Sequence, residues 1–195
     1  MSKVIETEIK LVVSNLTAAR SRVRSLGFRR VKPRQFESNI LFDFPDQRLR
    51  KARCLLRVRK TGGDCLLTFK GPPADTGLYK SREELETRLE DGGKAQEILV
   101  RMGMRRVFRY DKFRTVFAPP AVGKGGRHSL LTIDETPIGN YLELEGPDAW
   151  IDRTAAQLGY RQQDYITASY AALYRLHCEA LGRTPAEMVF ESNSV

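Results

Sequence analysis

The protein is a chain of 195 residues in which Lys and Arg outnumber Asp and Glu by 33 to 24, for a formal net charge of +9. The length suits one domain, and a content of 41% hydrophobic and 29% charged residues excludes wholesale disorder. No apolar run approaches the roughly 18 residues of a membrane helix, and Glu6 comes too early for a signal peptide. Because three cysteines do not suggest a disulfide scaffold, we expect a cytoplasmic protein, with no membrane partner. The excess of positive charge predicts an affinity for anions.

The order of predicted elements is mostly β, with helices between groups of strands. The predicted strands are 4–13, 37–43, 54–60, 64–70, 80–88, 106–117, 129–135 and 140–145. The predicted helices are 15–27, 94–102, 147–158 and 164–181. No regular βαβ succession is present, which favours an antiparallel or closed sheet. We expect a single domain over 1–182 and a polar C-terminal tail over 183–195.

Many predicted strands carry ionised side chains on one face and apolar side chains on the other. In the first strand Ile9 and Leu11 alternate with Glu8 and Lys10, because successive side chains of a strand point to opposite faces. An ordinary solvent-exposed face would mix in more uncharged polar residues. Carboxylates two residues apart lie roughly 6–7 Å from each other on one face, and their repulsion is unfavourable unless cations lie between them.

These charged faces have a consistent explanation if they converge inside a closed sheet. Burying so many charges costs several kcal/mol for each one that stays dry and unpaired. A water-filled channel that binds a polyanion together with metal ions removes that cost. Carboxylates would hold hard divalent cations, and Lys and Arg would bind phosphate oxygens.

A series of motifs resembles a known family. The first strand contains Glu6-Thr7-Glu8-Ile9-Lys10, a Glu-x-Glu-x-Lys signature. Behind it come Leu56-Arg57-Val58-Arg59, Leu67-Thr68-Phe69-Lys70-Gly71, Arg82-Glu83-Glu84-Leu85-Glu86, Lys112-Phe113-Arg114, Asp134, Gly139-Asn140-Tyr141-Leu142-Glu143-Leu144-Glu145 and Ser169-Tyr170-Ala171-Ala172-Leu173. Over roughly residues 4–178 the chain resembles the CYTH domain, the triphosphate tunnel metalloenzymes, which include class IV adenylyl cyclases and thiamine triphosphatases.

The resemblance implies an α+β fold: a closed eight-stranded antiparallel β barrel, or tunnel, with a charged interior and flanking helices. It implies one or two divalent cations, Mg²⁺ or Mn²⁺, at Glu6, Glu8, Asp134, Glu143 and Glu145. It implies a basic set that binds the triphosphate: Lys10, Arg57, Arg59, Lys70, Arg82, Lys112 and Arg114. Glu84 and Glu86 match further acidic tunnel positions. We take Lys10, Glu8 and Glu145 as the candidate catalytic residues.

Three functions remain open at this point. We favour hydrolysis of the terminal phosphate of inorganic, thiamine or nucleoside triphosphate, because it assumes no second specificity. The alternative is a class IV adenylyl cyclase that converts ATP to cyclic AMP and pyrophosphate, and the second alternative is a non-catalytic protein that binds polyphosphate or nucleic acid. We do not expect nucleic acid as the partner, because aromatic residues are only 9% of the chain. A homodimer is one open alternative for the oligomeric state.

Overall fold

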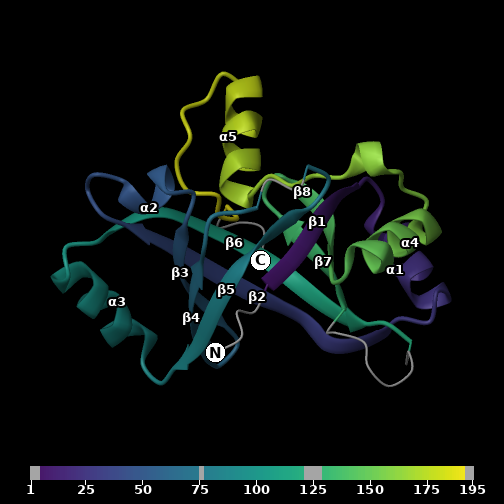
Figure 1. Ribbon diagram of the computed structural model, residues 1–195, viewed down its shortest axis with the longest axis horizontal. Helices are drawn as coiled ribbons and strands as arrows, with labels where there is room; N and C mark the ends of the chain where they lie inside the picture. Colours follow the sequence, from purple (N-terminus) through teal and green to yellow (C-terminus); the bar gives the residue numbers. More distant parts are fainter. Residues whose placement is uncertain (1–4, 75–76, 121–128, 192–195) are drawn as a thin grey trace.

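Eight antiparallel strands close into a barrel in the computed structural model of this protein, which describes residues 5–74, 77–120 and 129–191 (Figure 1). The strands follow one another around the barrel in the order β1-β5-β4-β3-β2-β6-β7-β8. Their bounds are β1 Ile5–Val13, β2 Arg29–Asp43, β3 Leu55–Thr61, β4 Asp64–Lys70, β5 Lys80–Leu89, β6 Arg105–Ala118, β7 Leu130–Thr136 and β8 Gly139–Glu145. The predicted fold class is confirmed: the barrel is closed and helices flank it.

The helices lie outside the barrel. Their bounds are α1 Leu16–Ser25, α2 Arg48–Lys51, α3 Gly92–Arg101, α4 Asp148–Leu158 and α5 Tyr170–Ala180, and a short 3₁₀ helix, η1, follows α4 at Gln162–Asp164. Figure 1 shows α1 and α4 together on one side, α2 and α3 on the opposite side, and α5 projecting from the barrel between them. In the described part of the chain, no helix is long and apolar enough to cross a membrane.

The alternation of the strands turns their apolar side chains outward against these helices. Ile9 of β1, Ile133 of β7 and Leu142 of β8 are fully or almost fully buried in one cluster with Val23 of α1 and Ile151 of α4. The hydrophobic core therefore lies between the barrel and its helices, and the opposite faces of the same strands are left to line the interior.

Three regions differ from the predicted elements. Strand β2 begins at Arg29, eight residues before the predicted strand 37–43. Pro33 has no N–H for the sheet, but register shifts on either side of Lys32 accommodate it, so the strand continues through this position. The short helix α2 has no counterpart among the predicted elements; the Asp43 carboxylate stabilises its start by accepting N–H bonds from Leu49 and Arg50 at 3.0 Å each. Helix α5 begins later than predicted, at Tyr170 instead of residue 164.

The delay of α5 has a physical reason in the preceding segment. The pairing of β1 with β5 stops at Glu8 and Lys80, so the backbone of Lys10 has no partner strand on that side. Ile166 supplies the missing pair: Lys10 and Ile166 each donate an N–H to the carbonyl of the other at 2.9 Å. The helix starts only after this bridge, with the Ser169 hydroxyl as its N-cap.

Part of the segment expected to be a polar tail packs against the barrel. Met188 is fully buried beside Tyr110 and Tyr170. Its N–H donates to the Arg109 carbonyl at 3.0 Å, and its carbonyl accepts the Asp111 N–H at 2.8 Å. Residues near Met188 thus help to fix the end of the barrel where α5 is attached.

The packing of α4 leads to a stability prediction. Ile151→Ala removes a fully buried side chain between α4 and the barrel, so we expect it to lower the free energy of unfolding by about 3 kcal/mol. Ile98→Ala on α3, where the side chain is 58% exposed, is the matched control and should change stability by less than about 0.5 kcal/mol. Denaturant unfolding measures both; equal losses would contradict this assignment of the core.

Candidate active site in the tunnel

Charged side chains from neighbouring strands meet in the interior of the barrel. Strand register places Glu8 of β1 opposite Glu145 of β8 on one side and Lys80 of β5 on the other. Lys10 lies opposite Glu143 in the same way. The carboxylates therefore concentrate on the wall made by β5, β1 and β8, where successive strands bring them side by side.

Lys70 compensates one pair of these carboxylates. Its Nζ donates to Glu6 in a short contact and lies 3.1 Å from Oε2 of Glu84. Burial and the neighbouring Glu8 nevertheless raise the pKa of Glu6 to about 8, whereas Lys70 acts to lower it. Near neutral pH Glu6 therefore holds a proton, which its hydrogen bond with Glu84 favours, and added positive charge would favour the ionised form.

Two further lysines compensate Glu8. The Glu8 Oε1 lies 2.6 Å from Nζ of Lys80 and 3.3 Å from Nζ of Lys10, which also lies 3.4 Å from Oε1 of Glu143. These cations outweigh burial and hold the pKa of Glu8 well below its usual range. Burial and the nearby Lys10 and Arg82 lower the pKa of Lys80 to about 8. Lys10 keeps its charge, because Glu8 and Glu143 outweigh burial and raise its pKa.

Asp134 is enclosed in a network of its own donors, which Glu143 joins to Lys10. It is fully buried, and it accepts hydrogen bonds from Nε of Arg114 at 2.7 Å, Nζ of Lys112 at 2.8 Å and the hydroxyl of Tyr170 at 2.7 Å. Arg114 also contacts Glu143. Both carboxylate oxygens of Asp134 are therefore engaged, and in this state its contacts orient Lys112 and Arg114 rather than offer a free metal ligand.

Three guanidinium groups of the tunnel have unused hydrogen-bonding capacity: Arg57 and Arg59 on β3 and Arg82 on β5. Arg57 reaches the Tyr110 hydroxyl at 3.3 Å and the Thr68 hydroxyl at 3.2 Å, yet its Nε has no partner among the described residues. The buried Nε atoms of Arg59 and Arg82 also lack one in the described structure. Burial and the adjacent Arg57 lower the pKa of Arg59. Buried donors without acceptors are costly, so these three side chains fit an anion that would supply the acceptors.

Glu145 is the carboxylate with the least compensation. No side-chain hydrogen bond or ion pair joins it to another described residue. Burial, together with Glu8 and Glu84, raises its pKa to about 7, although Lys70 and Arg114 act in the opposite direction. A half-buried carboxylate of this kind beside Glu8 is well suited to accept a cation.

The residues fit a divalent cation in chemistry but are not yet arranged around one. Glu6, Glu8 and Glu145 offer only oxygen atoms, the ligands that Mg²⁺ and Mn²⁺ favour. Within the described ranges, however, no three acidic, His or Cys side chains already converge on one point. The ammonium groups of Lys70 and Lys80 lie where they neutralise these acids, so a metal ion has to compete with them.

Several lining residues are absent from the predicted set. Glu37 is buried between Lys112 and Arg59, with its Oε2 at 3.7 Å and 4.0 Å from their nitrogens. Glu37 and Lys80 continue the two-residue alternation of their strands, so an extension of that pattern finds both. Tyr170 packs on the barrel against Tyr110 and Tyr141, but its contact with Asp134 has no signal in the sequence.

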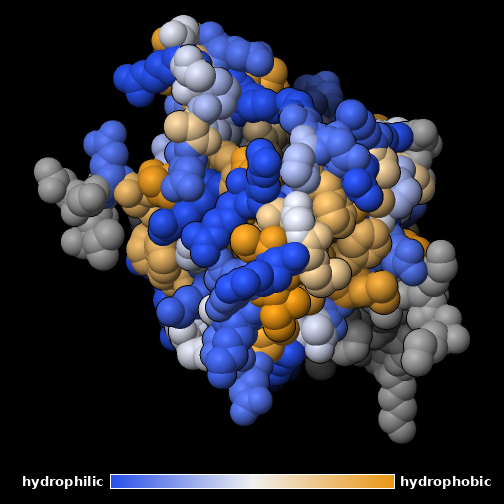
Figure 2. All heavy atoms as spheres, turned by 90° about the vertical axis from the view of Figure 1, so that its left-hand side faces the viewer, coloured by the Kyte–Doolittle hydropathy of each residue, from blue (hydrophilic) through white to orange (hydrophobic). Residues whose placement is uncertain are grey.

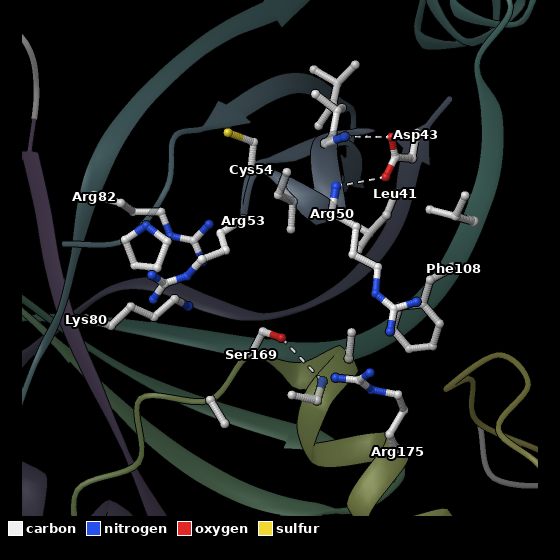
Figure 3. Close-up of a pocket in the computed structure, with 18 of the residues that line it drawn as sticks. Leu41, Asp43, Arg50, Arg53, Cys54, Lys80, Arg82, Phe108, Ser169 and Arg175 are labelled. Atoms are coloured by element: carbon white, nitrogen blue, oxygen red, sulfur yellow. Dashed lines mark hydrogen bonds between the residues drawn. The ribbon is translucent and has the colours of Figure 1, made fainter. Parts of the chain in front are cut away.

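A cavity of about 1080 Å³ lies at one mouth of the tunnel. Its walls come from α2, the start of β5, the start of β6 and α5, and Lys80 and Arg82 line it where it meets the tunnel. Figure 3 shows these two side chains on the same side as Arg53, with Arg50 and Arg175 across the cavity. The cavity is therefore an entrance vestibule that adjoins the charged interior.

Comparison with known proteins agrees with this geometry. Residues 4–170 match the CYTH domain, and the chain belongs to that family. A curated relative, a putative adenylate cyclase from Methanocaldococcus jannaschii, is 30% identical over 142 residues, which cover 72% of this chain and 76% of the relative.

Solved structures share the fold. A putative adenylate cyclase from Vibrio parahaemolyticus superimposes with a TM-score of 0.73 at 22% identity, over 87% of this chain and 97% of the other. A putative adenylyl cyclase from Hippeastrum, described as having a dominant triphosphatase activity, has a TM-score of 0.60 at 17% identity, over 92% and 97% of the two chains.

The raised pKa of Glu145 leads to a prediction for the metal-free protein. The folded state binds a proton at Glu145 that the unfolded state releases near pH 4.5, so the contribution of this group to stability falls as the pH rises from about 4.5 through about 7. Glu145→Gln removes that loss. In EDTA at pH 8 we expect the variant to be more stable than the wild type by on the order of 2 kcal/mol, and at pH 5 we expect little difference.

Thermal or denaturant unfolding at the two pH values measures this effect. Glu97→Gln, on the exposed part of α3, controls for the loss of one negative charge. A Glu145→Gln protein that is less stable than the wild type at pH 8 would contradict the description of Glu145 as an uncompensated, half-buried acid.

Proposed function

We propose that this protein is a divalent-metal-dependent enzyme that binds a triphosphate inside the tunnel and hydrolyses its terminal phosphate, with Mg²⁺ or Mn²⁺ as the cofactor. The observation that carries the proposal is that one tunnel contains both guanidinium groups with unused donors and carboxylates that are short of positive charge. A triphosphate and a divalent cation together supply what both sets of groups lack. The family membership and the neighbouring triphosphatase support the same conclusion.

The basic residues would position the phosphate chain. Arg57, Arg59 and Arg82 offer free Nε donors, and a planar guanidinium binds phosphate oxygens in a bidentate manner. Lys112 and Arg114 are oriented by Asp134 and so present their remaining donors from fixed positions. Phosphoryl transfer needs little more from the protein than such positioning and neutralisation of charge.

The acidic wall would hold the metal. Glu6, Glu8 and Glu145 form the set of oxygen ligands that lies closest together. Asp134 and Glu143, which lies beside Lys10, are further candidates from the sequence. When bound, the cation would neutralise phosphate oxygens and lower the pKa of a coordinated water. As the triphosphate draws Lys70 and Lys80 toward its own oxygens, the carboxylates that these lysines now occupy become available.

Lys10 has a different part in this arrangement. Its ammonium keeps its proton, because Glu8 and Glu143 raise its pKa, so it cannot serve as a general base near neutral pH. It lies 5.3 Å from the centre of the Tyr170 ring, where a cation–π contact holds it. We assign it the role of a fixed donor that stabilises charge on the transferring phosphate.

Hydrolysis and cyclisation give different products. In hydrolysis, water attacks the terminal phosphorus, the bond from that phosphorus to the bridging oxygen breaks, the remaining diphosphate departs as the leaving group, and the terminal phosphate is released as orthophosphate. In the cyclase alternative, which the vestibule and the names of the relatives favour, the ribose 3′-hydroxyl attacks the α-phosphorus of ATP and pyrophosphate leaves. Incubation with inorganic triphosphate or ATP and Mn²⁺, with chromatographic separation, distinguishes orthophosphate from cyclic AMP with pyrophosphate.

The assignment of the metal ligands has a direct mutational test. Glu8→Gln and Glu145→Gln should each lower the turnover of inorganic triphosphate by on the order of 10²–10³, with unchanged circular dichroism. Glu97→Gln on α3 should keep wild-type turnover. Near-wild-type turnover by Glu145→Gln at saturating Mg²⁺ would refute its role.

A complete lack of turnover would have another meaning. If no triphosphate reacts under either metal while RNA or polyphosphate binds with a steep dependence on salt, the protein is a binder and the enzymatic proposal fails.

A further inference from the structure

The entrance vestibule has more positive charge than a triphosphate in the tunnel would use. Five basic side chains line it: Arg50, Arg53, Lys80, Arg82 and Arg175. Lys80 and Arg82 lie opposite Glu8 and Glu6 in the sheet register, so they belong to the tunnel end of the cavity. Arg50 comes from α2 and Arg175 from α5, and Figure 3 shows them across the cavity from Lys80 and Arg82.

Arg50 and Arg175 are available for a ligand. Arg50 donates to the neutral side chain of Gln47 at 3.2 Å, and neither guanidinium forms an ion pair with any described residue. Both side chains are exposed. Among the described lining residues Asp43 is the one carboxylate, and its oxygens already accept N–H bonds from Phe44, Leu49 and Arg50.

Part of the cavity wall is apolar and aromatic. Phe108 and Tyr174 lie 5.9 Å apart, centroid to centroid, and both line the cavity with Leu41 and Ala171. Figure 2 shows a mixture of hydrophilic and hydrophobic side chains on the side of the molecule that carries α2. A volume of about 1080 Å³ lies just above the range of small-molecule sites, which is about 300–1,000 Å³, and this leaves room for an organic group beside the phosphate chain.

From this arrangement we propose that the vestibule binds the organic end of a triphosphate when that end is aromatic and carries a negative charge of its own, such as a nucleoside triphosphate with an additional ribose phosphate. The triphosphate would pass Lys80 and Arg82 into the tunnel. The base would lie against Phe108 and Tyr174, and the additional anion would reach Arg50 and Arg175. The inference rests on the proposed function, since it assumes that a triphosphate occupies the tunnel.

Equilibrium binding tests the inference without requiring turnover. The probes are ATP, ATP with a phosphate on its 3′ or 2′ ribose oxygen, and thiamine triphosphate, whose organic end is cationic. Calorimetry in EDTA prevents metal-dependent reaction. We expect at least one of the phosphorylated ATP isomers to bind about tenfold more tightly than ATP, as charge-assisted hydrogen bonds predict, and thiamine triphosphate to bind more weakly than ATP.

Variants assign the preference to the two arginines. Arg50→Gln and Arg175→Gln should each lower the ratio of affinities for phosphorylated ATP over ATP by about threefold or more, and the double variant should abolish it. Arg24→Gln, an exposed arginine on α1 at the other side of the barrel, is the matched control and should leave the ratio unchanged.

Two results would overturn the inference. One is that neither phosphorylated isomer binds more than twofold tighter than ATP, and the other is that the preference persists in the double variant. The proposed function is judged separately, by turnover of inorganic triphosphate, which has no organic end. Turnover without the binding preference refutes the inference alone, whereas the binding preference without any turnover refutes the enzyme and leaves the vestibule site in place.

Discussion

A closed barrel that turns its charged face inward must compensate every ionised group that it buries. The outer faces of the same strands are committed to the core, where Ile9, Ile133 and Leu142 meet α1 and α4. The inner faces of these strands therefore carry the charged side chains, away from that core. Compensation comes from the neighbouring strand, as Glu8 with Lys80 and Asp134 with Arg114 show. Where it is incomplete, at Glu145 and at the free Nε atoms of the arginines, the tunnel is ready for ligands.

This constraint explains why the net charge of +9 says little about the site. The predicted interior acids and bases are equal in number, and the two residues that the structure adds, Glu37 and Lys80, are one of each sign. The excess of positive charge thus lies outside the tunnel interior, and part of it surrounds the vestibule at Arg50 and Arg175. The balance inside also means that substrate and metal have to displace existing ion pairs, which couples the binding of one to the binding of the other.

Most of the barrel can be predicted from the sequence because its signal is local. A two-residue alternation identifies which side chains share a face, and it correctly assigns Glu8, Lys10, Arg57 and Arg59 to the inner surface. It fails in the first half of β2, where consecutive basic residues and Pro33 hide the pattern. The contact between Tyr170 and Asp134 cannot be predicted in this way, because it depends on where α5 docks after the bridge at Ile166.

Lysines occupy the carboxylates to which we assign the metal, and this competition is the central claim about the tunnel. Mn²⁺ binding to the protein alone, followed by electron paramagnetic resonance, tests it most directly. Lys80→Met frees Glu8, so the Kd for Mn²⁺ should fall by about tenfold, equivalent to about 1.4 kcal/mol. Lys94→Met on α3, whose side chain is 82% exposed, should bind as the wild type does. Equal affinities in the wild type and Lys80→Met would contradict the account.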